Sequence, residues 1–121
     1  MNWLVIDDER TFDVSHVPPI SNEVPTELNY ARNSNDGLLA IAKHCVAYTL
    51  HYGEELMLYL DHDLGGSDTI LPVINFLVSV QVPGIAWIKI HSQNPVSADY
   101  VQVLRHAGYI CQKVSLPKLQ G

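Results

Sequence analysis

Acidic side chains directly follow two short apolar segments of the chain. Asp7 and Asp8 come after the first segment, and Asp61 and Asp63 come after the second. Two carboxylates about 4 Å apart repel by roughly 4 kcal/mol at an effective dielectric constant of about 20, so converging carboxylates need a counter-charge or bound protons. Oxygen ligands in this number suit Mg²⁺ or Mn²⁺. We therefore predict that Asp7, Asp8 and Asp61 bind such a cation, while Asp63 either completes the metal shell or orients a histidine.

A simpler interpretation of these acidic residues is that they end strands and cap turns, as carboxylates commonly do. A single pair of this kind would be weak evidence for a metal site. The repetition of the pattern after two buried segments favours the metal site.

Further polar residues follow the apolar segments. His62 lies next to Asp61, and His91 and Ser92 follow another apolar run. An isolated histidine is usually a satisfied core or surface residue, but an imidazole beside a metal can transfer a proton to or from a phosphate ester. Ser92 can donate a hydrogen bond to a phosphoryl oxygen. Asn94 either contacts a phosphate or begins a helix, since Asn-Pro is a helix-start signal.

The charge balance restricts the kinds of partner. Thirteen acidic residues against seven basic ones give a net charge of -6, which disfavours a surface that binds many phosphates of DNA. Any nucleic-acid contact is therefore expected to be local. Arg10, after the first acidic pair, either clamps one phosphate bidentately or forms a salt bridge with a neighbouring carboxylate.

The elements that must position these groups follow from the apolar pattern. Short apolar runs predict five strands, at residues 3–6, 28–31, 56–60, 85–90 and 109–114. Helical patterns separate the last four strands, which implies right-handed crossovers and a parallel sheet with helices on both faces. We predict an α/β fold with a doubly wound, flavodoxin-like sheet of strand order 2-1-3-4-5. In such a sheet ligands bind at the carboxyl ends of the strands, where the polar clusters lie.

The boundaries of the helices follow from capping signals. Residues 33–36 offer caps for a first helix, which Gly53 would end in a left-handed conformation. Ser67 is the predicted cap of a second helix, and a third is expected over residues 97–107. Residues 8–27 have no period and contain three prolines, so we expect an irregular connection.

Size and cysteine content indicate one domain over residues 1–121 in the cytoplasm. The chain has 121 residues, 47% of them hydrophobic, which is enough for one core. Cys45 and Cys111 lie far apart and match no Cys-x-x-Cys spacing, so both are expected to be reduced thiols. The chain shows no signal sequence and no apolar segment of membrane-spanning length, so we expect no membrane association.

Asp7 and Asp8 after the first strand, Asp61 after the third and Ser92 after the fourth resemble the site of response-regulator receiver domains. The resemblance covers nearly the whole chain. In receivers the acidic pair and the Asp of the third strand bind Mg²⁺, that Asp accepts a phosphoryl group, and a Ser or Thr after the fourth strand contacts it. The resemblance assigns these roles to the four residues here.

One receiver feature is displaced in this chain. A receiver has a Lys directly before a Pro at the end of the fifth strand, whereas this sequence has Pro117 before Lys118, and Lys113 inside the predicted strand. Because that ammonium normally pairs with the phosphorylated Asp, its loss weakens the phosphorylation switch. Whether Lys113 or Lys118 replaces it stays open.

Three segments resemble a divergent branch of receivers more closely, namely residues 4–10 (LVIDDER), 60–65 (LDHDLG) and 90–95 (IHSQNP). This branch is the family of cyclic-phosphate-processing receiver domains, found in phage and bacterial genomes. The resemblance implies a metal-dependent phosphoesterase that opens a cyclic phosphate, on a small nucleotide or at an RNA end. Catalysis would then rest on Asp61, His62, His91 and Ser92.

Two other functions stay open from the sequence. The first is a non-enzymatic receiver that binds a partner protein and is either phosphorylated on Asp61 or constitutively inactive. The second is a protein that sequesters a cyclic nucleotide without cutting it. Turnover separates the enzyme from the sequestering protein, and formation of an acyl phosphate identifies the receiver.

Overall fold

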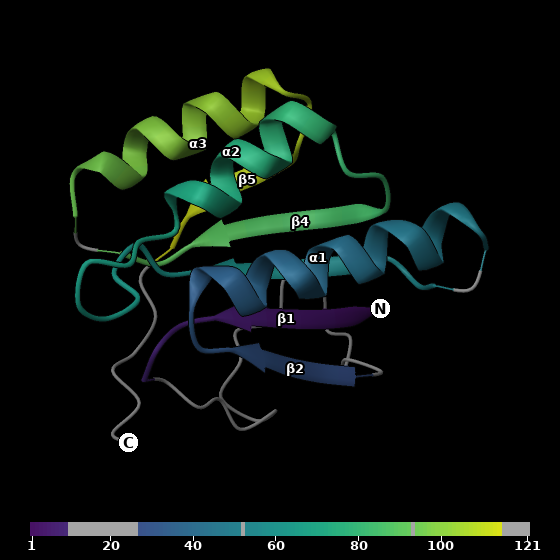
Figure 1. Cartoon of the computed structure of the whole chain (residues 1–121). Coiled ribbons are helices and arrows are strands. Elements are labelled where there is room, and N and C mark those ends of the chain that lie inside the picture. The colour runs from purple at the N-terminus through teal and green to yellow at the C-terminus, as the bar shows by residue number, and fades with distance from the viewer. Residues whose placement is uncertain (10–26, 52, 93, 115–121) are drawn as a thin grey trace.

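The computed structural model describes residues 1–9, 27–51, 53–92 and 94–114. Five parallel strands form one sheet: β1 (Asn2–Ile6), β2 (Glu27–Ala31), β3 (Leu56–Leu60), β4 (Ile85–Ile90) and β5 (Cys111–Lys113). The helices are α1 (Ser34–Thr49), α2 (Leu71–Val80) and α3 (Val96–His106). The strand order is β2-β1-β3-β4-β5, as predicted, and Figure 1 shows α1 crossing in front of the sheet, with α2 and α3 above β4.

The apolar content of each strand matches its place in the sheet. All five residues of β3 are buried, as are four of the five in β1, because both strands lie inside the sheet with side chains packed on its two faces. In β2, by contrast, exposed and partly buried residues alternate up to Ala31. This pattern fits an edge strand and explains why its apolar signal in the sequence is weaker.

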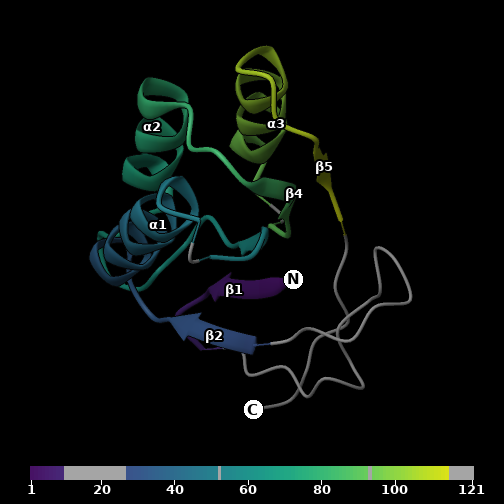
Figure 2. The same cartoon turned by 90° about the vertical axis from the view of Figure 1, so that its right-hand side faces the viewer.

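All three helices of the described residues pack on one face of the sheet, where we had expected helices on both faces (Figure 2). The reason is the direction of the crossovers. The connections that contain α1, α2 and α3 all step along the sheet in the same direction, and right-handed crossovers then place their helices on the same face. The connection that steps the other way, from β1 to β2, is the predicted irregular segment, and nearly all of it lies outside the described residues.

The second face of the sheet carries its own apolar cluster. Its buried members are Trp3, Val5, Met57 and Tyr59. The rings of Trp3 and Tyr59 lie 5.7 Å apart. Side chains alternate between the two faces along a strand. Asp7 and Asp61, which come two residues after Val5 and Tyr59, therefore lie on the same face as this cluster. The second face is therefore the one that leads to the predicted site.

The helix boundaries correct two details of the sequence interpretation. Asn33 caps α1 as predicted, since its side chain accepts a hydrogen bond from the backbone three residues later. The left-handed residue after α1, however, is His51, with φ 63°, and Gly53 instead donates its N–H back to the carbonyl of Ala47. Ser67 does not cap α2, because the helix begins only at Leu71. Ser67 lies in the preceding loop, where the N–H of Ile70 donates to the carbonyl of His62.

Both cysteines are free thiols, as expected from their spacing. Cys111 is buried in the main core, and burial raises its pKa to about 12. Among the described residues, no helix combines the length and apolar character needed to cross a membrane.

Candidate metal and phosphate site

Four strands end side by side at the carboxyl edge of the sheet. After each of them, a backbone N–H donates to the last carbonyl of the neighbouring strand. The bonded pairs are Asp7–Ala31 (3.1 Å), Asp61–Ile6 (3.0 Å), His91–Leu60 (2.9 Å) and Val114–Ile90 (2.9 Å). We call Asp7, Asp61, His91 and Val114 the terminal row. Strand alternation places its members on the second face of the sheet.

The structure brings together three of the four predicted metal ligands. Asp7, Asp8 and Asp61 each offer a carboxylate oxygen, and these oxygens lie within 4.8 Å of one another. Asp7 is only 1% exposed, and the other two residues are partly buried. A group made of carboxylate oxygens alone fits a hard cation such as Mg²⁺ or Mn²⁺ better than zinc, which prefers nitrogen and sulfur. The donors present therefore fit the predicted metal.

Asp7 is held by a nearby backbone N–H and by the side chain of Arg32. One of its carboxylate oxygens, Oδ1, accepts the N–H of Glu9 at 3.0 Å, and its carbonyl accepts Nη1 of Arg32 at 3.2 Å. The guanidinium carbon of Arg32 lies 4.8 Å from the ring centroid of Tyr30, within cation–π distance. Our sequence interpretation missed Arg32. Its place directly after a predicted strand, at the same edge as the acidic clusters, was the available signal.

The loop from β3 to α2 approaches Asp8. Gly65 in this loop has φ 90°, and a Cβ atom built there would lie 3.2 Å from Oδ2 of Asp8. The same loop is tied to α1, because the Asp68 carboxylate accepts hydrogen bonds from the backbone N–H of Ser34 at 2.8 Å and from its hydroxyl at 2.6 Å. These bonds hold the pKa of Asp68 below its ordinary value. The loop is thus fixed close to one predicted metal ligand.

His91 lies against the carboxylate group. Its side chain is buried, and Nε2 is 3.8 Å from Oδ2 of Asp7. Leu60 pairs with Ile90 in the sheet, so the next residue, His91, lies opposite Asp61, and Ser92 is one step farther on. The residue of the fourth strand that shares the terminal row with Asp61 is therefore the histidine.

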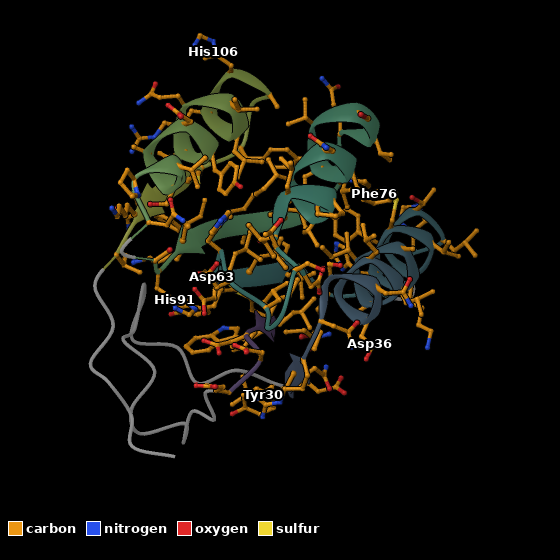
Figure 3. All side chains as sticks on the ribbon, turned by 60° about the vertical axis from the view of Figure 1, so that its left-hand side comes forward. Tyr30, Asp36, Asp63, Phe76, His91 and His106 are labelled. Atoms are coloured by element: carbon orange, nitrogen blue, oxygen red, sulfur yellow. The ribbon has the colours of Figure 1, made fainter. Side chains whose placement is uncertain are left out.

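His62 occupies a different environment. Its Nδ1 is 3.0 Å from the hydroxyl of Tyr100 on α3, and its Nε2 is 3.8 Å from Oδ1 of Asp63. The side chain of Asp63 is 78% exposed and does not belong to the group of three carboxylates. Figure 3 labels Asp63 and His91 at the same end of the molecule, far from His106 in the last turn of α3. Of the two roles predicted for Asp63, this placement favours the one beside a histidine.

Ser92 and Asn94 are the predicted phosphate contacts that the structure describes. The hydroxyl oxygen of Ser92 accepts the N–H of Asn94 at 3.1 Å, and a hydroxyl that accepts one hydrogen bond can still donate its own hydrogen. Oδ1 of Asn94 accepts the N–H of Val96 at 3.1 Å, so this side chain satisfies the start of α3. Arg10 lies outside the described residues, and its phosphate contact stays a prediction.

The family of the cyclic-phosphate processing receiver domain matches residues 3–106, a range that extends from β1 to the end of α3 and contains every predicted site residue. No curated protein and no solved structure matches the chain. Since the family match covers far more than half of the 121 residues, the chain belongs to the family of cyclic-phosphate processing receiver domains.

Proposed function

We propose that this domain is a metal-dependent phosphoesterase that hydrolyses a cyclic phosphate, on a small cyclic nucleotide or at an RNA end. The observation that carries the proposal is the group of three carboxylates within 4.8 Å of one another, with His91 buried against one of them. Membership in the family supplies the substrate class. The two free thiols fit a reducing compartment, so we place the reaction in the cytoplasm.

The reaction needs the net transfer of one proton from water to the leaving oxygen and one exchange of bonds at phosphorus. A bond forms between water oxygen and phosphorus, one ring P–O bond breaks, and the leaving oxygen gains a proton while the water loses one. Mg²⁺ or Mn²⁺, held by Asp7, Asp8 and Asp61, would supply charge stabilisation at the phosphate and acidify the attacking water. His91 accepts the proton of the water and then donates it to the leaving oxygen, and the Asp7 carboxylate beside it stabilises the imidazolium that exists between these two steps.

Two further groups bind the phosphate in this proposal. Ser92 donates its hydroxyl hydrogen to a phosphoryl oxygen. Arg32, already held by the carbonyl of Asp7 and the ring of Tyr30, provides a positive charge at the same edge of the sheet. A guanidinium held in place loses little conformational freedom when it binds an anion.

The arrangement of the fifth strand favours hydrolysis over a phosphorylation switch. The β5 member of the terminal row is Val114, an apolar residue. Lys113 pairs with Ile90, whose side chain lies in the core under the helices, so Lys113 follows the alternation toward that opposite face. Lys118 lies outside the described residues. A phosphorylated Asp61 would therefore have no lysine beside it within the terminal row.

The test is hydrolysis of a panel of cyclic mono-, di- and trinucleotides and cyclic-phosphate RNA ends, in Mg²⁺, in Mn²⁺ and in chelator. We expect turnover only with metal. Asp61→Asn should remove both turnover and the metal-dependent rise in melting temperature. His91→Ala should lower the rate on the order of 10²- to 10⁴-fold while the metal-dependent rise survives.

The competing functions give different results in the same assay. The wild-type protein is also treated with acetyl phosphate and examined by mass spectrometry. No turnover together with a phosphorylated Asp61 would replace the hydrolase by a switch that acts through a protein partner. Tight binding of a cyclic nucleotide without turnover would replace it by a sequestering protein.

A further inference from the structure

One carboxylate joins the loop from β3 to α2 to the start of α1. Oδ2 of Asp68 accepts the backbone N–H of Ser34 at 2.8 Å, and Oδ1 accepts the hydroxyl of the same residue at 2.6 Å. These two bonds lower the pKa of Asp68, so the carboxylate is ionised at neutral pH. Both of its oxygens are therefore bonded to the first residue of α1.

Short contacts inside the loop connect Asp68 with Asp8. The N–H of Asp68 donates to the carbonyl of Gly65 at 3.0 Å, and the N–H of Leu64 donates to the carbonyl of Asp68 at 3.1 Å. Leu64 itself is buried in the main core. Gly65 lies so close to Asp8 that a Cβ atom on it would be 3.2 Å from Oδ2. A series of contacts thus runs from Ser34 to a carboxylate of the predicted metal site.

The turn between β2 and α1 also holds the other member of the acidic pair. Nη1 of Arg32, two residues before Ser34, donates to the carbonyl of Asp7 at 3.2 Å. Carboxylates as close together as the three of this site repel one another when no cation is bound. Contacts outside the group must therefore keep the carboxylates in place until a cation arrives.

We propose that Asp68 is a positioning residue of the metal site, which is bonded to Ser34 and holds the loop against Asp8. It touches neither the metal nor the substrate. The inference rests on the proposed function only through its divalent cation. Groups that orient a metal ligand typically contribute about 10- to 100-fold to metal affinity, and Asp68 is expected at the lower end because it acts through Gly65.

Calorimetric titration with Mn²⁺ tests this role, at a temperature at which every variant is folded. Asp68→Ala removes both bonds to Ser34, and we expect its dissociation constant for Mn²⁺ to rise about 10-fold. Asp68→Asn removes the charge but keeps an acceptor for the N–H and adds a donor for the hydroxyl, so its affinity should stay within about 3-fold of the wild type.

The two substitutions separate position from charge. Equal losses in Asp68→Ala and Asp68→Asn would mean that the negative charge attracts the cation and that the bonds to Ser34 do not matter, which would overturn the proposal. An unchanged affinity in folded Asp68→Ala would also overturn it.

Asp36→Ala is the matched control, because it removes another carboxylate at the start of α1. Asp36 accepts a hydrogen bond from the side-chain amide of Asn33 at 3.0 Å, and its own N–H donates to Oδ1 of Asn33 at 2.8 Å. These bonds stay within the start of the helix. We expect Asp36→Ala to bind Mn²⁺ as the wild type does. A loss equal to that of Asp68→Ala would mean that any weakening of this helix start lowers metal affinity, and would contradict a specific role for Asp68.

A double-mutant cycle identifies the route to the metal ligand. Gly65→Ala changes the contact with Asp8 from within the same loop. If Asp68 acts through Gly65, Asp68→Ala should weaken Mn²⁺ binding much less in the Gly65→Ala protein than in the wild type. Fully independent losses would contradict this route.

Mn²⁺ affinity and turnover together distinguish this inference from the proposed function. Weaker Mn²⁺ binding by Asp68→Ala, in a protein whose wild type cleaves no substrate, would support the positioning role and overturn the hydrolysis. Turnover by the wild type with full Mn²⁺ affinity in Asp68→Ala would do the opposite. A wild-type protein that binds no Mn²⁺ would overturn both.

Discussion

Lys89 is a buried cation on the face of the sheet that leads to the site. It lies on β4, pairs in register with Tyr59 and Gln112, and is 8% exposed. Among the described residues its ammonium makes no hydrogen bond or ion pair, and burial lowers its pKa. Partial removal of an ammonium from water disfavours its charged form. We therefore expect Lys89 to lower the free energy of unfolding.

Replacing this lysine should stabilise the protein. Lys89→Met keeps a long side chain and removes the charge, and we expect its melting temperature at pH 7 to rise by roughly 2–5 °C. The folded pKa of Lys89 is below the unfolded value, so the unfolded state binds more protons between those two pKa values. The stability of the wild-type protein should therefore rise with pH across that interval, and Lys89→Met should lack this contribution.

The measurement is denaturant unfolding of both proteins from pH 7 to just below the ordinary tyrosine pKa. The upper limit matters because burial raises the pKa of Tyr59 to about 12. Above its ordinary value the folded state holds that proton while the unfolded state loses it, which lowers stability as pH rises. Equal stability of Lys89→Met and wild type at every pH in the interval would contradict the destabilising role of Lys89.

The loop between β3 and α2 lies against Asp8, one of the three predicted metal ligands. Gly65 and Gly66 both have positive φ, 90° and 57°, so a side chain strains the backbone at either position. A Cβ at Gly65 would also lie 3.2 Å from Oδ2 of Asp8, whereas one at Gly66 would meet no atom within 4 Å. The pair therefore separates backbone strain from displacement of Asp8.

We expect Gly65→Ala and Gly66→Ala to lower stability by similar amounts, about 1 kcal/mol each. Only Gly65→Ala should also weaken metal binding, because the new methyl group displaces a ligand oxygen. Calorimetric titration with Mn²⁺ measures this difference. Equal metal affinity in the two variants would mean that the loop does not control the position of Asp8.

Elements with a strong local signal could be predicted, and tertiary contacts could not. β1 and β3 are unbroken apolar runs, so their burial, their place in the sheet and the acidic residues after them follow from the sequence. The predicted start of α2 was wrong, because the residues before the helix form a loop whose hydrogen bond from Ile70 to His62 exists only in the folded protein. The contact between His62 and Tyr100 depends on how α3 packs, which no local pattern specifies.

At the scale of the whole molecule, the charge distribution orders the binding steps. The chain has a net charge of -6 and gathers three carboxylates at one edge of its sheet. This field attracts cations and repels anions. A phosphate substrate is therefore expected to bind well only after the metal has neutralised part of the charge, which makes metal binding the first step.

Because the metal should bind only the folded sheet, a thiol elsewhere in that sheet can report on it. Cys111 in β5 is 3% exposed, and burial raises its pKa to about 12, although the nearby Arg105 partly opposes this shift. A buried thiol with so little thiolate reacts with an alkylating reagent only when the structure opens. Cys45 is partly buried, so the measurement uses Cys45→Ser to leave one thiol.

In the Cys45→Ser protein, we expect Mn²⁺ at about 100 times its dissociation constant to slow alkylation of Cys111 by about 100-fold relative to chelator. The same comparison with Asp8→Asn added should show a much smaller effect, since that variant lacks one of the three carboxylates. The rates are measured by mass spectrometry of the alkylated protein over time. Equal rates in Mn²⁺ and chelator would mean that the carboxylates do not form a metal site coupled to the fold. Because the alkylation rate depends on neither substrate nor turnover, this result judges the metal site apart from the proposed reaction.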